Sequence, residues 1–226
     1  PEDHIAASRE FGPLAIHVMA EQLLPGHPEI LLVTNRQENG RYIGIPDLGR
    51  GWHTDTSYTE EPAMASLLYA LETPSDGSGH TQFADTTAAH DALPHDMQRR
   101  IAGLKAEHIY EHDHEHFSPS DAQRKTLKGA IHPIVRTHPD TGQRALYLGP
   151  IMTKRVVGME VAEGQALLDE LHAHALALPF VHPHEWRDGD LLIWDNRCTL
   201  HRALPYDDKT RIRHMHRTTV CGDRPV

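Results

Sequence analysis

The chain has 226 residues, with 22 Lys and Arg against 32 Asp and Glu, which gives a net charge of −10 when His is neutral. That balance disfavours nucleic acid and anionic membranes as general partners, because both are themselves negatively charged. No apolar run approaches the roughly 20 residues that a membrane span needs.

The length fits one domain, which we take to be residues 1–226. Cys198 and Cys221 form no CxxC pair and predict no disulfide framework, so a reducing cytoplasm is the expected location. The chain begins at Pro1 rather than at Met, and we expect its N-terminus to be incomplete.

Apolar spacing predicts helices and strands along the whole chain. Helices are expected over Ala7–Leu24, from an N-cap at Thr86 or Thr87 to Leu93, from Pro94 to Leu104, and over Glu163–Leu178. Strands are expected over Glu29–Thr34, Ala65–Leu71, Thr81–Asp85, Ile131–Val135, Arg144–Leu148, Asp190–Trp194 and Ile212–Val220. This order favours a mainly β protein with flanking α-helices, built as a closed or sandwiched barrel.

The segment from Trp52 to Thr56 carries the first candidate chemistry. In an extended segment His53 and Asp55 project from one face, so both can bind one metal ion. His201 is the best candidate for a distant third ligand. Two His and one carboxylate on one side of an ion are typical of non-haem Fe(II) oxygenases. In a chain with 20 histidines, the pair alone also fits ordinary surface or packing residues.

The last predicted strand carries two arginines on one face. Arg213 and Arg217 are about 13 Å apart along it at about 3.3 Å per residue, and they can serve two anionic groups in one cavity. Two buried cations without anions would be costly. The alternative is that both pair with surface acids. Because this strand follows His201, we favour the functional interpretation.

Residues 108–117 alternate histidines with acids. They could form a second metal site, but a solvated loop is favoured because structural sites need specific spacing. Tyr110 and His112 are candidates to line a substrate pocket in this segment. Tyr58 and Phe83 are assigned to the core.

Four stretches together resemble the taurine dioxygenase/2,4-dichlorophenoxyacetate dioxygenase family. They are WHTD at 52–55, GHTQFADTTAAHDAL at 79–93, HPIVRTHPDTGQRALYLG at 132–149, and residues 189–220 with WDNRCTLH and RIRHMHR. The resemblance implies an Fe(II)- and 2-oxoglutarate-dependent dioxygenase with a double-stranded β-helix (jelly-roll) core.

The resemblance also implies roles for individual residues. His53, Asp55 and His201 match the iron ligands, and Thr81 and Arg213 match residues that hold the 2-oxoglutarate carboxylates. Arg217 matches an arginine that meets the substrate anion. Trp194 to Arg197 match a signature to which we assign structural support of His201. O2 would be consumed, succinate and CO2 released, and a dimer or tetramer is expected.

Two features depart from the family and leave the substrate open. The His-rich stretch 108–117 stands where relatives have a substrate-covering segment, and residues 49–51 lack the asparagine-containing approach of taurine-specific members. Sulfonates, sulfate esters and aryloxyalkanoates all fit. Two other classes stay open from the residues: a zinc hydrolase with the same ligands, and a non-catalytic barrel that binds a small anion or metal.

Overall fold

The computed structural model describes residues 1–46, 48–110, 120, 124 and 127–226. The strands are β1 (Leu23–Leu24), β2 (His27–Thr34), β3 (Gln37–Glu38), β4 (Arg41–Tyr42), β5 (Ala65–Glu72), β6 (Thr81–Asp85), β7 (Lys105–His108), β8 (Ala130–Pro133), β9 (Val135–Thr137), β10 (Arg144–Leu146), β11 (Thr153–Val156), β12 (Val181–His184), β13 (Leu191–Asp195), β14 (Thr199–Ala203) and β15 (His214–Val220). The helices are α1 (Glu2–Arg9), α2 (Thr86–Asp91), α3 (His95–Ile101) and α5 (Val161–Ala175), with short 3-10 turns η1 (Ala20–Gln22) and η2 (Leu178–Phe180). Among these described helices, none combines the length and the apolar character of a membrane span.

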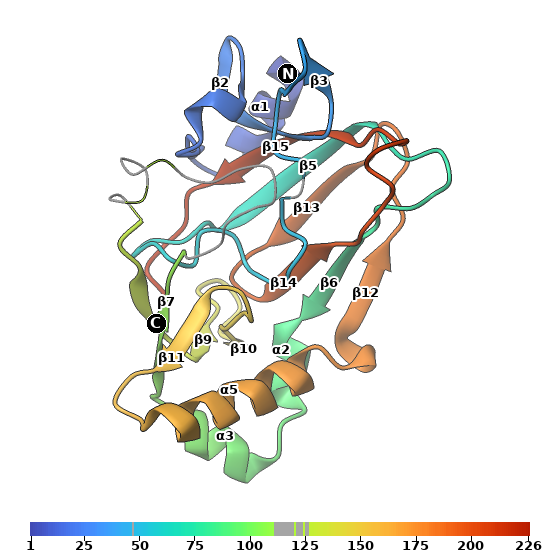
Figure 1. The fold of residues 1–226 in the computed structure, drawn as a ribbon. Coiled ribbons are helices and arrows are strands. Elements are labelled where there is room, and N and C mark those ends of the chain that lie inside the picture. Colours follow the sequence, from blue (N-terminus) through green and yellow to red (C-terminus); the bar gives the residue numbers. More distant parts are fainter. Residues whose placement is uncertain (47, 111–119, 121–123, 125–126) are drawn as a thin grey trace.

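Two antiparallel sheets position the candidate site (Figure 1). The larger has five strands in the order β1-β2-β15-β5-β13, and the smaller has three in the order β12-β6-β14. Further short ladders are β11-β7-β8, β10-β9 and β3-β4. The described residues are therefore mainly β with a few helices, and their sheets are not joined by hydrogen bonds into one closed barrel.

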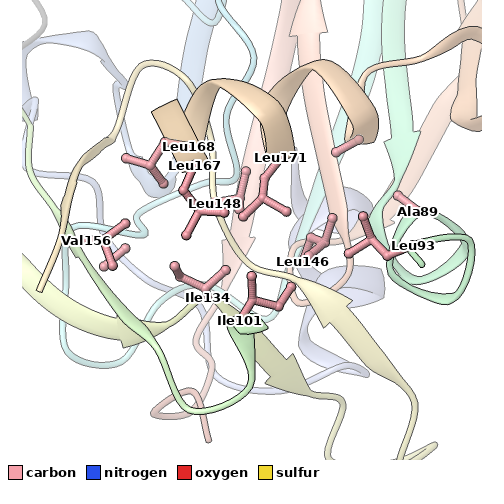
Figure 2. Packing of buried hydrophobic residues seen from close by; sticks show 12 residues of the cluster. Ala89, Leu93, Ile101, Ile134, Leu146, Leu148, Val156, Leu167, Leu168 and Leu171 are labelled. Atoms are coloured by element: carbon pink, nitrogen blue, oxygen red, sulfur yellow. The ribbon is translucent and has the colours of Figure 1, made fainter. Parts of the chain in front are cut away.

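A helical layer covers one end of the molecule, where α5, α2 and α3 lie together (Figure 1). Leu167 and Leu171 of α5 and Ile101 of α3 pack with Ile134 and Leu146 from the β8–β10 region, as Figure 2 shows. Burying a leucine-sized side chain contributes about 1.5–3 kcal/mol, so this cluster anchors the helices to the sheets. A second cluster includes Met215 of β15, and its members Val33, Leu68 and Trp194 also line the candidate site.

Six of the seven predicted strands appear with ends shifted by a few residues, and the strand predicted over 131–135 is divided between β8 and β9 of different sheets. The first predicted helix is wrong. α1 covers only Glu2–Arg9, and residues 10–19 are irregular. Gly12 has a φ of 146°, which helical residues do not adopt, and the next residue is Pro13. Leu14 instead forms a β-bridge with Val220, so tertiary pairing overrides the apolar spacing.

The predicted cap of the second helix is also wrong by one residue. The side chain of Asp85 accepts hydrogen bonds from the backbone N–H groups of Thr87 and Ala88, so Asp85 is the N-cap of α2. An aspartate at this position satisfies donors that the first turn leaves free. The helix itself is confirmed, and so are those of residues 94–104 and 163–178 in the forms of α3 and α5.

Candidate metal and cosubstrate site

His53, Asp55 and His201 meet in the interior, as the sequence predicts. One ligand atom from each lies within 4.8 Å of the others, and all three side chains are buried. Nε2 of His53 is 3.7 Å from Oδ1 of Asp55, and Nε2 of His201 is 3.8 Å from Oδ2. Two imidazoles and one carboxylate facing a common point form the donor set of a facial metal site.

Backbone pairing brings these distant residues together. His53 and His201 form an antiparallel bridge in which each backbone N–H donates to the other's carbonyl, at 3.1 and 2.8 Å. The chain then turns at Thr56, whose φ is 54°, and this turn leaves Asp55 beside both rings. His201 lies in β14, which pairs with β6, so a regular sheet fixes one ligand and a turn fixes another.

The outer contacts select the ligand atoms. Nδ1 of His53 lies 2.8 Å from the carbonyl of Gly51, and donation to that oxygen leaves Nε2 with its lone pair toward the metal position. Ser66 Oγ donates to Asp55 Oδ2 at 2.6 Å, and Asn196 Nδ2 donates to Ser66 Oγ at 3.0 Å. Asn196 Oδ1 also accepts from the backbone N–H of Asp55 at 3.2 Å. The residues thus fit a divalent metal.

Electrostatics keep these donors in their metal-binding forms. Burial by itself raises the pKa of the Asp55 carboxyl, but Arg217 and His201 beside it hold that pKa well below its usual range. Burial and the neighbouring His53 lower the pKa of His201 to about 3, so its ring is neutral near pH 7. A metal needs an ionised carboxylate and neutral imidazoles.

Thr81 and Arg213 lie in the same cavity as the two histidines. Its lining includes His53, His201, Thr81, Arg213 and Arg217. Arg213 Nη2 donates to Thr81 Oγ1 at 3.4 Å, and Nε donates to the carbonyl of Gly79 at 3.3 Å. Burial lowers the pKa of Arg213 to about 10, so the guanidinium is still charged near pH 7.

The Thr81 hydroxyl is oriented by a residue that the sequence analysis did not select. Trp186 Nε1, which can only donate, gives a hydrogen bond to Thr81 Oγ1 at 2.9 Å. The hydroxyl oxygen is then an acceptor toward Trp186 and Arg213, and its own proton is available to an anion. Within the described part of the chain, Arg213 forms no salt bridge with an acid. A cavity with a free cation and a free hydroxyl donor suits a carboxylate.

A second cavity lies next to the first and is largely apolar. It shares Leu48, Gly49, His53 and Arg217 with the first cavity and also touches Asp55. Its other lining residues are His17, Met19, Ile45, Thr56, Tyr58, Tyr110, Ile151 and Met152. Tyr110 therefore lies where the sequence analysis expected a pocket residue, while His112 lies outside the described residues. Tyr58, assigned to the core, is buried and also lines this cavity, edge-on to Tyr110 at 5.1 Å between ring centroids.

Arg217 makes a contact that the sequence analysis did not anticipate. Its Nη1 donates to Asp55 Oδ1 at 3.0 Å inside the protein. The side chain still borders both cavities. His216 of β15 borders a separate groove beside Tyr69.

A second group of His138, Asp195 and Cys198 also brings possible ligand atoms within 4.8 Å of one another. His138 Nδ1 accepts from the backbone N–H groups of Asp140 and Thr141, each at 3.3 Å. Its Nε2 therefore carries the proton and donates to Asp195 Oδ2 at 3.0 Å, which leaves no lone pair for a metal. We interpret this group as structural. The His-rich residues 111–117 lie outside the described residues.

The fold and this site together define a mainly β protein with a buried two-histidine, one-carboxylate group beside a cavity that contains a buried arginine. A family model described as "Taurine catabolism dioxygenase TauD, TfdA family" matches residues 1–219. The chain belongs to this TauD/TfdA family.

Individual relatives agree. The chain is 36% identical over 238 residues to an alpha-ketoglutarate-dependent 2,4-dichlorophenoxyacetate dioxygenase of Cupriavidus pinatubonensis, covering 100% of this chain and 82% of the relative. It is 34% identical over 215 residues to an alpha-ketoglutarate-dependent sulfate ester dioxygenase of Pseudomonas putida, covering 88% and 69%.

Solved structures also match. A taurine dioxygenase from Burkholderia xenovorans aligns with a TM-score of 0.82 at 32% identity, over 100% of this chain and 73% of that one. AAD-2 in complex with Mn(II) and N-oxalylglycine aligns with a TM-score of 0.76 at 33% identity, over 87% and 75%.

These comparisons identify the chain as an oxidoreductase, an alpha-ketoglutarate (2-oxoglutarate)-dependent dioxygenase of a small substrate. They decide between the classes that the residues left open, in favour of the dioxygenase over the zinc hydrolase and the non-catalytic binder. The family implies 2-oxoglutarate and a metal.

Proposed function

We propose that the chain is an Fe(II)-dependent hydroxylase of a small anionic organic substrate, with His53, Asp55 and His201 as the iron ligands. The observation that carries this proposal is the shared cavity in which the three ligands lie beside Thr81 and Arg213. Bound Fe(II) would supply O2 activation, coupled to decarboxylation of 2-oxoglutarate to succinate and CO2. We also propose a double-stranded β-helix (jelly-roll) core for the single domain, because the two antiparallel sheets flank this site.

Other residues of the chain would bind the cosubstrate, orient the Asp55 carboxylate and exclude water. Arg213 and Thr81 would bind the distal carboxylate of 2-oxoglutarate through charge-assisted hydrogen bonds. The Ser66–Asn196 contacts would hold the Asp55 carboxylate in place. Burial of all three ligands excludes bulk water from the reacting centre.

The second cavity would hold the primary substrate. Its apolar lining, with Tyr58, Tyr110, Ile151 and Met152, suits a compact carbon skeleton. Arg217 at its border would meet an acidic group, either a carboxylate or a sulfur oxyanion. Relatives named for 2,4-dichlorophenoxyacetate and for sulfate esters support this range. Aryloxyalkanoates, sulfonates and sulfate esters are the classes to test, and His112 stays a substrate-binding proposal.

The test is succinate release from Fe(II), 2-oxoglutarate and O2 with a panel of these acids. At least one should stimulate release in the wild type, and His53→Ala and Asp55→Ala should abolish it. His95→Ala is a matched control because His95 is exposed and far from the ligand set in sequence. Under anaerobic conditions Fe(II) with 2-oxoglutarate should also give a weak visible charge-transfer band. The absence of both signals in the wild type would refute the proposal.

We further propose that the protein acts in the cytoplasm as a dimer or tetramer. Cys198 and Cys221 are both free, which fits a reducing compartment.

A further inference from the structure

Asn35 holds three backbone positions of the segment that ends at Arg213 through its side-chain amide. It is 4% exposed and directly follows β2, opposite Arg213, which directly precedes β15. Its Oδ1 accepts from the backbone N–H of Arg213 at 2.9 Å. Its Nδ2 donates to the carbonyls of Asp208 and Arg211 at 2.8 and 2.7 Å. Both amide protons are therefore used, and both hold backbone rather than side chains.

The segment that Asn35 holds connects the strand of His201 to Arg213. Residues 204–213 run from the end of β14, which carries His201, to the start of β15. A Cβ atom on Gly79 would lie 3.4 Å from both Arg213 Cδ and Tyr206 Cδ1, so Tyr206 of this segment and the Arg213 side chain both approach Gly79. Asp208 Oδ2 also accepts from Arg50 Nη2 at 2.7 Å, close in sequence to His53.

The Arg213 side chain itself has only weak restraints. Its two hydrogen bonds, to Gly79 and Thr81, are long at 3.3 and 3.4 Å. The guanidinium carbon also lies over the ring of Trp186, 5.9 Å from the ring centroid. The position of the guanidinium therefore depends on where its backbone is fixed. The Asn35 side chain fixes the Arg213 N–H at 2.9 Å, whereas the Arg213 carbonyl accepts from the Asn35 backbone N–H at a longer 3.4 Å. A shift of about 1 Å in a group that positions a substrate can cost about 100-fold in reaction rate.

We infer that Asn35 is a positioning residue for 2-oxoglutarate: it sets the backbone of Arg213 and of residues 208–211, so that the guanidinium meets the distal carboxylate. The inference rests on the proposed function, since it requires that Arg213 binds 2-oxoglutarate. Asn35 does not itself border the cavity and acts through Arg213.

The test measures binding rather than turnover, by calorimetric titration of Mn(II)-loaded protein with 2-oxoglutarate. Asn35→Ala should raise the dissociation constant of 2-oxoglutarate at least tenfold, while that of Mn(II) changes less than twofold. Gln37→Ala is the matched control, because Gln37 is an exposed carboxamide two residues along the chain. Asp208→Asn removes the ion pair with Arg50 but keeps the carbonyl that Asn35 uses, and it should change the constant less than threefold.

A double variant separates positioning from general loosening of the fold. In an Arg213→Ala background, adding Asn35→Ala should weaken 2-oxoglutarate binding less than twofold further, because the residue through which it acts is gone. A further tenfold loss would overturn the inference. Should Asn35→Ala not fold, Asn35→Asp keeps an acceptor for the Arg213 N–H but loses both donated bonds. It should then weaken binding at least threefold, and an unchanged constant would overturn the inference.

The failure of the proposed function gives a different result. Wild-type protein that binds Mn(II) but not 2-oxoglutarate would overturn the proposed function, and this inference with it. Wild-type protein that binds 2-oxoglutarate, with Asn35→Ala binding it equally well, would overturn this inference alone.

Discussion

Replacing Ser66 with alanine tests whether the contacts behind Asp55 govern metal binding. Ser66 Oγ donates to Asp55 Oδ2 at 2.6 Å in a site where the serine is fully buried. Without this donor, the hydrogen bond from Arg217 to Asp55 Oδ1 at 3.0 Å remains, and the carboxylate can rotate toward Arg217. Asn196 Nδ2 also loses its acceptor.

The magnitude follows from two opposing effects. Loss of a donor makes the carboxylate more basic, which favours a metal, but it also removes the orientation that the metal position needs. A hydrogen bond to a charged group contributes about 1.5–3 kcal/mol, and about 1.4 kcal/mol corresponds to tenfold in affinity. Orientation dominates at sites of this kind, where outer contacts cost about 10–100-fold in metal affinity. We therefore expect Ser66→Ala to weaken Fe(II) binding about 10- to 100-fold.

The assay is anaerobic competition for Fe(II) with a chromophoric chelator, followed by succinate release at saturating metal. Ser8→Ala is the matched control, since Ser8 is a buried serine bonded to His4 and Thr218 rather than to a metal ligand. It should lower thermal stability without changing the Fe(II) dissociation constant. A Ser66→Ala protein that binds Fe(II) within twofold of the wild type would refute the reasoning.

Three other predictions follow from the same geometry. Arg213→Ala should raise the 2-oxoglutarate requirement about 100-fold or more with iron still bound, because it removes the buried cation of the cavity; unchanged dependence in a steady-state titration would show that the arginine is misassigned. Arg217→Ala should reduce kcat/KM selectively for anionic primary substrates, and equal loss for neutral ones would contradict its role. His108→Phe should make the free energy of unfolding less sensitive to acid. Burial and the neighbouring His132 lower the pKa of His108 in the folded protein to about 3. The stability that the neutral ring contributes is therefore complete above about pH 6.5 and is lost as the pH falls toward 3. Between pH 7 and 5 the metal-free wild type should lose up to about 2 kcal/mol more than His108→Phe in urea unfolding, and equal losses would refute the assignment.

Of the candidate ligands, His53 and Asp55 could be predicted together because their signal is local, whereas the choice of the distant His201 depended on the family resemblance. Spacing places His53 and Asp55 together, and a strand pattern places Arg213 and Arg217 on one face, both facing the cavity. The predicted strands form because short apolar runs bounded by turns suit strands buried on both faces, as most of β5 and all of β15 are. The helix predicted over residues 7–24 does not form, because the backbone conformation of Gly12 and the β-bridge at Leu14 are incompatible with it. Apolar spacing alone does not reveal either feature.

The residues missed by sequence reasoning act across long separations. Ser66 meets Asp55, Trp186 meets Thr81, and Asn35 meets Arg213, and each pair is brought together only by sheet pairing. No spacing rule connects them, since β12 must first pair with β6 to bring Trp186 to Thr81, and β2 with β15 to bring Asn35 to Arg213. Asn196 was assigned a structural role beside His201, and its contacts instead reach Asp55 through Ser66 and directly through the backbone.

Charge balance in the buried site supports the choice of a monoanionic substrate. Under the proposed function, Fe(II) brings two positive charges, and Arg213 and Arg217 bring one each to cavities that exclude water. Asp55 and dianionic 2-oxoglutarate offset three of these. One positive charge is left, at Arg217, whose salt-bridge partner among the described residues is the Asp55 carboxylate that the metal would also use. An uncompensated buried charge is costly, so a substrate with one acidic group near Arg217 neutralises the site, while a neutral substrate leaves the guanidinium competing with iron for Asp55.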